Sequence, residues 1–327
     1  MEVLSGMKIT KLSIVFVLIA LCCIIQLDIK MNNIVAINQK KIEYNQALEG
    51  AVDDAVLKLV DMDNSKTVTY SLNKEACVNQ FYMSLYSSFG ILDSPSDQKM
   101  LMNYIPVLAV TDSNGYFISY IDSYIDDDGV AMYSRVWSEK KPYYYKGDKL
   151  IYSFTFSDYM KVYDTETKEV DEGYFEDLKK LYPDEYLFQD KEVFDQIRRN
   201  AIVDCLQNDM KYYINNYNKI AENFGITYDF YLPAVDENDW QRTIDSISLF
   251  VVFQGYPYGY GTNDVYNRYA YAGARVKKAD MYFITERDGT KIYHRSDCEE
   301  VTNYNNPVYS KKECALQGAY PCEQCRP

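Results

Sequence analysis

The sequence is poor in histidine and lacks the common catalytic signatures. Its 327 residues include one histidine, His294. The patterns Gly-x-Ser-x-Gly and His-Glu-x-x-His and the glycine-rich phosphate loop are all absent from it. The spacing of His294 from three cysteines, described below, assigns it to a metal site. No imidazole then remains for a Ser-His or Cys-His mechanism. Carboxylates are abundant, but the sequence does not show which of them meet, so a hydrolase has no catalytic group that we can name.

Positive charge is also scarce. The chain has 34 Lys and Arg against 48 Asp and Glu, a net charge of −14. The first 28 residues are neutral and residues 281–327 carry six Lys and Arg against seven Asp and Glu, so the acidic surplus falls on residues 29–280. An acidic body has no basic surface for a phosphate backbone. We therefore expect no nucleic-acid partner.

The apolar run near the N-terminus lacks a cleavage site. Residues 12–27 are almost wholly apolar and follow Lys8 and Lys11. A helix of about 19 residues nearly spans the ~30 Å hydrocarbon layer. Because no Ala-x-Ala-like site follows Leu27, we favour an uncleaved anchor over a cleavable signal peptide. We predict that residues 1–28 form a cytoplasmic tail and a single-pass anchor in the cell membrane, with the N-terminus inside and the C-terminus outside.

Apolar residues continue past the anchor at helical spacing. They recur at steps of three, four and seven, and charged residues mostly occupy the other faces. These apolar residues are Ile34, Ile37, Tyr44, Leu48, Ala51, Ala55 and Leu59. The pattern predicts an amphipathic stalk helix that runs from the anchor into the head. The layout of residues 1–63 resembles that of type IV pilins and pseudopilins, although Lys11 stands where that family has a glutamate. The resemblance implies a pilus-like assembly component whose stalk helix contacts protein partners.

Residues 29–280 are predicted to form an α+β head outside the membrane. After the stalk we expect a strand at 67–72, a helix at 75–89, a hairpin at 106–120 and strands at 131–137, 150–156 and 160–163. The Val-x-Asp-x-x-Gly sequence of the hairpin, from Val110 to Gly115, resembles hairpins of PAS and Cache sensor domains. That resemblance implies a ligand-binding sensor subunit, and an ordinary sheet core is the other interpretation.

A long helix is predicted in the second half of the head. Ten apolar residues from Phe194 to Phe224 mark one face, Asp190 can cap the start, and Gly225 follows the end. At roughly 50 Å it is long enough to run alongside the stalk helix. A strand at 227–232, a helix at 236–246 and a strand at 249–253 are expected next. The Gly/Tyr segment 254–261 is interpreted as a loop that covers the core, with a ligand or glycan site as the alternative.

Residues 281–327 contain the one motif that predicts a specific site. His294 and Cys298 form His-x3-Cys, and Cys322 and Cys325 form Cys-x2-Cys after a gap of 23 residues. Zinc in structural sites takes four nitrogen or sulfur ligands in a tetrahedron, and a Cys-x2-Cys turn supplies two of them along one edge. The spacing therefore predicts a structural zinc site with no open position for water. A disulfide or a reduced surface pair is the alternative interpretation of these cysteines.

The surroundings of the four residues predict a small module. Asp288-Gly289 suits a hairpin turn between strands at 281–286 and 290–293, and a short helix is expected at 311–317. The sequences Tyr-His-x3-Cys, Ser-x-x-Glu and Gly-x-Tyr-Pro-Cys-x2-Cys-x-Pro resemble the metal-binding domain of the Ada DNA-repair protein, which also occurs as an appendage of unrelated bacterial proteins. The resemblance implies the fold and the zinc. In Ada the first ligand is a cysteine that accepts a methyl group, and His294 stands in its place, so methyl transfer is not expected.

Three other cysteines are predicted to be packed core residues. Cys314 lies within the short helix and is interpreted as a core residue, not a fifth ligand. Cys77 and Cys205 are interpreted as separate buried thiols, and a disulfide between them is the alternative.

Together these features predict a membrane-anchored, non-enzymatic, extracytoplasmic protein with a structural zinc module, in the role of an envelope or pilus-like assembly component. A sensor subunit and an Ada-like repair protein are the two alternatives.

Overall fold

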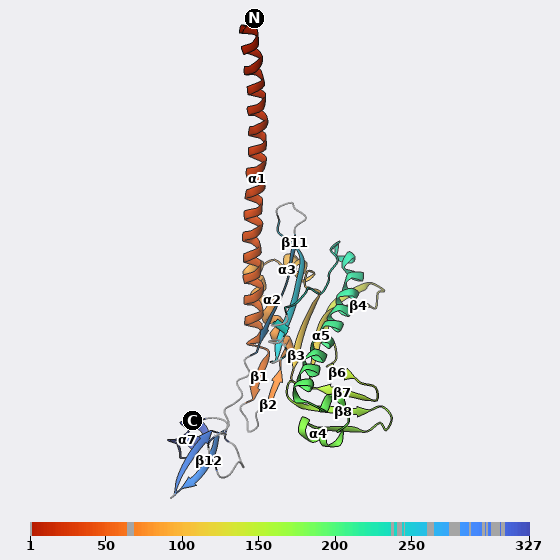
Figure 1. Ribbon diagram of the computed structural model, residues 1–327, viewed down its shortest axis with the longest axis vertical. Helices are drawn as coiled ribbons and strands as arrows, with labels where there is room; N and C mark the ends of the chain where they lie inside the picture. Colours follow the sequence, from red (N-terminus) through yellow and green to blue (C-terminus); the bar gives the residue numbers. More distant parts are fainter. Residues whose placement is uncertain are drawn as a thin grey trace.

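The computed structural model describes residues 2–63, 69–236, 239–240, 244, 246–259, 265–274, 282–287, 289–295, 298, 300–301, 308 and 311–327. The fold is mixed α+β, as the sequence predicted, with antiparallel sheets, packed helices and a long apolar helix at the N-terminus (Figure 1). The predicted helix at 236–246 lies largely outside the described residues, and so do the last two residues of the Gly/Tyr segment, 260 and 261.

One helix, α1 (Glu2–Val56), joins the apolar N-terminal segment to the core of the head (Figure 1). Its 55 residues contain no proline, so no break in the backbone hydrogen bonds is expected along it. The predicted stalk face is confirmed where the helix meets the head, since Leu48, Ala51 and Ala55 are buried there. In the part of the chain that the structure describes, this is the one helix long and apolar enough to cross a membrane, and the same features fit a signal sequence.

A five-stranded antiparallel sheet forms the centre of the head, in the order β11-β10-β3-β4-β5. The strands are β3 (Val107–Asp112), β4 (Gly115–Ile125), β5 (Ala131–Trp137), β10 (Ser248–Pro257) and β11 (Val265–Gly273). Three consecutive strands form a meander, and β10 returns after a long excursion to pair with β3, which is a Greek-key connection.

Alternate residues of the central strands enter two separate cores, one on each face of the sheet. On β3, Val107 and Ala109 face one core while Leu108 and Val110 face the other. The second core lies under α1 and the helix α2 (Lys74–Phe89), which is capped by the Asn73 side chain. The first core lies under the helix α5 (Lys191–Ala221). A sheet buried on both faces explains why β3 and β10 consist of continuous apolar runs.

The structure corrects two predictions about the second half of the head. The helix α5 begins after Asp190 as predicted, but the sheet separates it from α1, so the two helices do not run side by side (Figure 1). The segment 227–232 forms no strand. The side chain of Asn218 on α5 instead donates to the carbonyl of Phe230 and accepts from its N–H, and so replaces a strand partner.

The segment between β5 and α5 forms a second sheet of four antiparallel strands. They are β6 (Tyr143–Lys146), β7 (Leu150–Phe154), β8 (Tyr159–Asp164) and β9 (Val170–Tyr174). The helix α4 (Phe175–Leu181) and the short 3-10 helix η1 (Tyr186–Phe188) follow and pack with this sheet against α5. Smaller elements complete the head: α3 (Pro95–Met102), η2 (Glu222–Phe224) and the hairpin of β1 (Val60–Asp63) and β2 (Thr69–Leu72).

The described C-terminal residues form a three-stranded sheet and a short helix. The strands β12 (Tyr282–Arg287) and β13 (Thr290–Arg295) form the predicted hairpin, with Gly289 in the turn at a φ of +77°. The helix α7 (Lys311–Leu316) precedes β14 (Ala319–Pro321), which pairs in parallel with β13 and was not predicted. Two small apolar clusters lie here, and all their members come from residues 282–325.

Candidate metal centre

Two strands of the C-terminal sheet bring His294, Cys298, Cys322 and Cys325 together. His294 is the fifth residue of β13, and Cys298 follows the end of that strand by three residues. Parallel pairing sets Pro321 opposite Tyr293, so Cys322 follows directly beside His294. The N–H of Cys322 donates to the carbonyl of Tyr293 at 3.0 Å and holds this register. The pairing of two segments that lie far apart in sequence therefore builds the cluster.

The four residues lie close enough to share one ion. The ligand atoms of His294, Cys298, Cys322 and Cys325 all lie within 4.8 Å of one another. The Nδ1 atom of His294 is 3.5 Å from the Sγ atom of Cys298. A tetrahedral zinc with bonds of 2.0 to 2.3 Å has nitrogen to sulfur edges of about 3.5 Å. This distance thus fits two ligands of one tetrahedral ion.

The cluster is almost closed to solvent. His294 is 1% exposed, Cys298 5% and Cys322 3%, while Cys325 is half-buried. Burial lowers the pKa of His294, an effect that the nearby Glu300 carboxylate opposes, and the lower pKa favours the neutral imidazole that can bind a metal. A buried set of three thiols and one imidazole is a soft donor set, which zinc prefers over magnesium or calcium.

Backbone and side-chain hydrogen bonds orient the donors. Thr285 on β12 lies with its Oγ1 atom 2.8 Å from Nε2 of His294. A metal bound to Nδ1 requires the proton on Nε2, and Thr285 then accepts that proton's hydrogen bond. The N–H of Arg295 points to the Sγ atom of Cys325 at 3.5 Å, a contact that stabilises a thiolate. In the metal-free form the protonated thiol of Cys322 donates to Glu300 at 3.4 Å, and this proton is lost when the sulfur binds a metal.

The other cysteines lie away from this cluster. Cys314 is fully buried among Tyr282, Tyr293 and neighbouring apolar residues, and burial raises the pKa of its thiol. It is a core residue, as predicted. Cys77 on α2 and Cys205 on α5 lie in the two different cores of the head, so the prediction of separate buried thiols is confirmed. Burial raises the pKa of Cys77 to about 12, which leaves the thiol protonated and unreactive at neutral pH.

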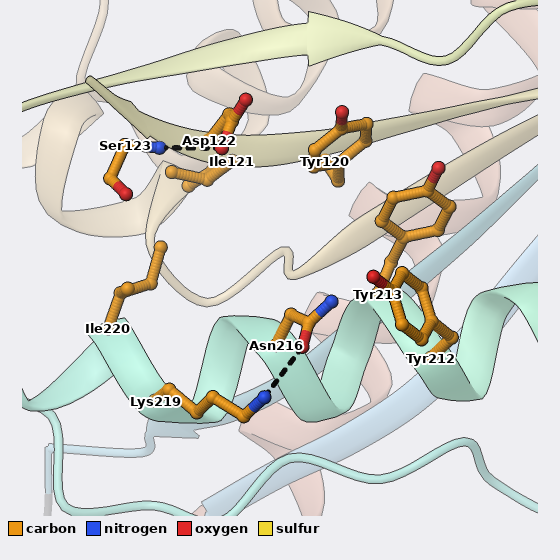
Figure 2. A pocket seen from close by; sticks show the side chains of 9 residues that line it. All are labelled: Tyr120, Ile121, Asp122, Ser123, Tyr212, Tyr213, Asn216, Lys219 and Ile220. Atoms are coloured by element: carbon orange, nitrogen blue, oxygen red, sulfur yellow. Dashed lines mark hydrogen bonds between the residues drawn. The ribbon is translucent and has the colours of Figure 1, made fainter.

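The head has a hollow of about 370 Å³ between β4 and α5 (Figure 2). Tyr120 and Tyr213 stack on each other at one end of it with ring centroids 4.2 Å apart, and Lys219 donates to the side chain of Asn216 at 2.9 Å. Asp122 is the single carboxylate among the residues that line it. The lining therefore holds neither an imidazole nor a pair of carboxylates for acid and base catalysis. The predicted loop at 254–261 is wrong in its first half, because the strand β10 continues through Pro257. Tyr256 and Tyr258 pack on Tyr44 of α1, which agrees with the expectation that tyrosines of this segment cover the core.

Comparison with known proteins finds no matching family model, no similar curated protein and no similar solved structure.

Proposed function

We propose that the chain is a single-pass, membrane-anchored protein with an extracytoplasmic α+β head and a C-terminal module folded around one structural zinc ion. The observation that carries this proposal is the buried cluster of three cysteines and one histidine. Four protein ligands fill a tetrahedron, so no position remains for a water nucleophile or a substrate. The ion then stabilises the module and takes no part in hydrolysis.

The order of elements supports an Ada-like fold for this module. The hairpin carries His294, Cys298 follows its second strand, and a short helix and then the Cys-x2-Cys turn come after them. Methyl transfer in Ada uses a zinc-bound cysteine at the first ligand position. His294 occupies that position, and an imidazole lacks a thiolate that could accept the methyl group. The acidity of residues 29–280 further opposes a function on DNA.

Membrane anchoring is supported by the length and composition of α1. The most apolar stretch of 18 residues in α1 has a mean hydropathy of 2.4, and none of that stretch is buried within the protein. A helix of this kind with solvent on all sides is unfavourable in water and stable in lipid. Lys8 and Lys11 next to the apolar run favour an inside N-terminus, which leaves the head and the zinc module outside.

We further propose that residues 281–327 are a separate folding unit of the extracytoplasmic part. Among the residues that the structure describes, their two apolar clusters share no residue with the cores of the head. A module of this size has too small a core to fold without a metal, and zinc binding supplies on the order of 10 kcal/mol in such modules. The role that fits these parts is that of a non-enzymatic envelope component, in which α1 contacts partner helices as in pilus-like assemblies.

Metal analysis tests the zinc site. The purified chain in detergent should contain one zinc per chain. The variant Cys322→Ser/Cys325→Ser should lose it, and Cys314→Ala should retain it, because Cys314 lies outside the cluster. Thiol modification of the metal-free form should then reach all four cysteines of the module. A chain without zinc, or a zinc content unchanged in the double variant, would overturn the proposal.

Membrane extraction and protease access test the anchor and its orientation. The chain should remain in membranes washed with alkaline carbonate, and protease added to the outer side should degrade the head. Release by the carbonate wash, or protection of the head from outside protease, would contradict the proposed anchor or its orientation.

A further inference from the structure

The stalk part of α1 carries a second apolar stripe, on the face turned away from the head. Met31 is 65% exposed, Val35 61% and Ile42 57%. The face toward the head carries Ile37, Tyr44 and Leu48, which pack on the second core. At 3.6 residues per turn the two stripes lie on nearly opposite sides of the helix. The head therefore leaves the second stripe uncovered.

The spacing of this stripe is that of a coiled coil. Met31, Val35, Asn38 and Ile42 follow one another at steps of four, three and four, which places Val35 and Ile42 at a positions and Met31 and Asn38 at d positions. The same steps continue into the anchor at Ile24, Leu21, Val17 and Ile14, and Asp28 occupies the a position between the two parts. A seven-residue apolar repeat keeps one face of a helix against a partner helix.

Lipid does not reach most of this stripe. At a rise of 1.5 Å per residue, Val35 lies about 10 Å and Ile42 about 21 Å beyond Asp28. The headgroup layer on each side of a bilayer is only about 5 to 7 Å thick. Both side chains would therefore be exposed to water in a lone anchored chain.

We propose that this stripe is covered by the same stripe of a second copy of this chain, in a parallel two-helix coil. The inference rests on the proposed membrane anchoring. The anchor holds all copies in one membrane, in one orientation and at one depth, so a two-fold axis along the membrane normal brings Val35 against Val35 and Ile42 against Ile42 without a shift. β-branched residues at a positions, here Val35 and Ile42, favour two strands.

The surroundings of the stripe permit this arrangement. The flanking e positions carry the uncharged side chains of Asn32, Gln39 and Gln46. The heads lie on the outer sides of the pair, because each head packs on the opposite face of its own helix. The Asp28 side chains of the two copies would repel each other near the membrane surface. We therefore expect the two helices to be closest on the C-terminal side of Asp28. The stripe beyond Asp28 spans about two heptads, which is too short to hold a dimer in dilute solution, so confinement to the membrane is required.

Cysteine cross-linking of the full chain in native membranes tests the proposal. The parent variant is Cys22→Ser/Cys23→Ser, so the anchor contributes no thiols. Ile42→Cys is compared with Lys41→Cys and Glu43→Cys, which are exposed neighbours at the same height but on other faces of α1. Val35→Cys is compared in the same way with Asn33→Cys. Zinc is present throughout to protect the module, and the parent variant without an added cysteine gives the background.

The expected result is a disulfide-linked product of twice the chain mass that forms severalfold more from Ile42→Cys and Val35→Cys than from their neighbours. Equal yields at positions 41, 42 and 43 would indicate random collision and overturn the proposal. A cross-linked product of another mass would show a different partner and also overturn it. A separate portion of the same membranes is washed with alkaline carbonate. Loss of the chain at this step contradicts the anchor itself, whereas retention without cross-linking contradicts only the second copy.

Discussion

At the scale of single residues, the metal cluster depends on a side chain outside the ligand set. Thr285 lies diagonally across the hairpin from His294 and contacts its Nε2 atom. This contact fixes the ring orientation that turns Nδ1 toward the thiols, so Thr285 acts on the metal through His294.

The variant Thr285→Val keeps the shape of the side chain and removes the hydroxyl. We expect zinc affinity to fall by about 10- to 100-fold, as is usual when the hydrogen-bond partner of a metal-bound histidine is lost. Competition with a chromophoric chelator measures the change. Thr285→Ser should retain the affinity, and an unchanged affinity in Thr285→Val would show that the contact does not position the ring.

The four candidate ligands could be predicted from spacing alone, because Cys-x2-Cys is a local turn and one histidine leaves one choice. Thr285 could not be predicted, because its contact depends on the register of β12 against β13. The partner Glu300 could not be predicted either, since its approach to Cys322 depends on the path of the chain after Cys298.

At the scale of elements, one side chain organises the segment that follows α5. Asn218 bonds both backbone groups of Phe230, whose ring is buried against Tyr217. In Asn218→Ala both partly buried backbone groups lose their partner, and we expect a loss of about 2 kcal/mol in the free energy of unfolding. Asn216→Ala on the same helix should cost less, because its side chain accepts one bond from an exposed lysine. Urea unfolding of the part from Asp28 to Pro327 compares the two variants, and equal losses would contradict this role of Asn218.

The register of β10 against β11 shifts between Gln254 and Tyr256, and this bulge allows a second test at this scale. Gly255 has a φ of +78°, and an added Cβ would lie 2.8 Å from the ring of Tyr228. Gly259 has a φ of +80° and open space around it. Alanine at either position bears a backbone cost of roughly 1 kcal/mol. Gly255→Ala should be more destabilising by about a further 1 to 3 kcal/mol because of the clash. Thermal unfolding measures both, and similar midpoints would show that the tyrosine moves aside freely.

Elements with long or regular patterns could be predicted from the sequence. The helices α2 and α5 and the hairpin of β3 and β4 have clear periodicity or a polar turn, and their bounds agree closely with prediction. The strand β9 could not be predicted, because Val-Asp-Glu-Gly-Tyr has an edge-strand composition with little apolar content. Periodicity also does not say which elements meet. The length of α5 would have allowed it to run alongside α1, but it lies on the far face of the sheet.

At the scale of the whole molecule, the 34 tyrosines make stability sensitive to alkaline pH. Burial raises the pKa of the most enclosed tyrosines well above its ordinary value of 10.0, and these include Tyr116, Tyr143, Tyr152, Tyr217 and Tyr266. Acceptor carboxylates add to the effect at Tyr116, which donates to Asp209, and at Tyr152, which donates to Glu185. The unfolded chain ionises at lower pH than the folded one. The stabilisation is therefore complete below about pH 10 and is lost as the pH rises further.

Each such tyrosine should lower the free energy of unfolding by about 1.4 kcal/mol per pH unit above about pH 10. We expect cooperative unfolding in this range, with tyrosinate absorbance rising in step with the loss of near-ultraviolet circular dichroism. Gradual ionisation of all the tyrosines while the circular dichroism persists would contradict the prediction.

The continuity of α1 has a mechanical consequence. Its first half is the apolar segment and its last turns, from Ala47 to Val56, belong to the core of the head, with no loop between them. A pull or a tilt applied to the apolar end acts on the core as through a stiff rod of roughly 80 Å. The head cannot rotate independently of this rod, so the helix sets the orientation of the head relative to the apolar end of α1. An axial load would be borne first by the packing of Leu48, Ala51 and Ala55.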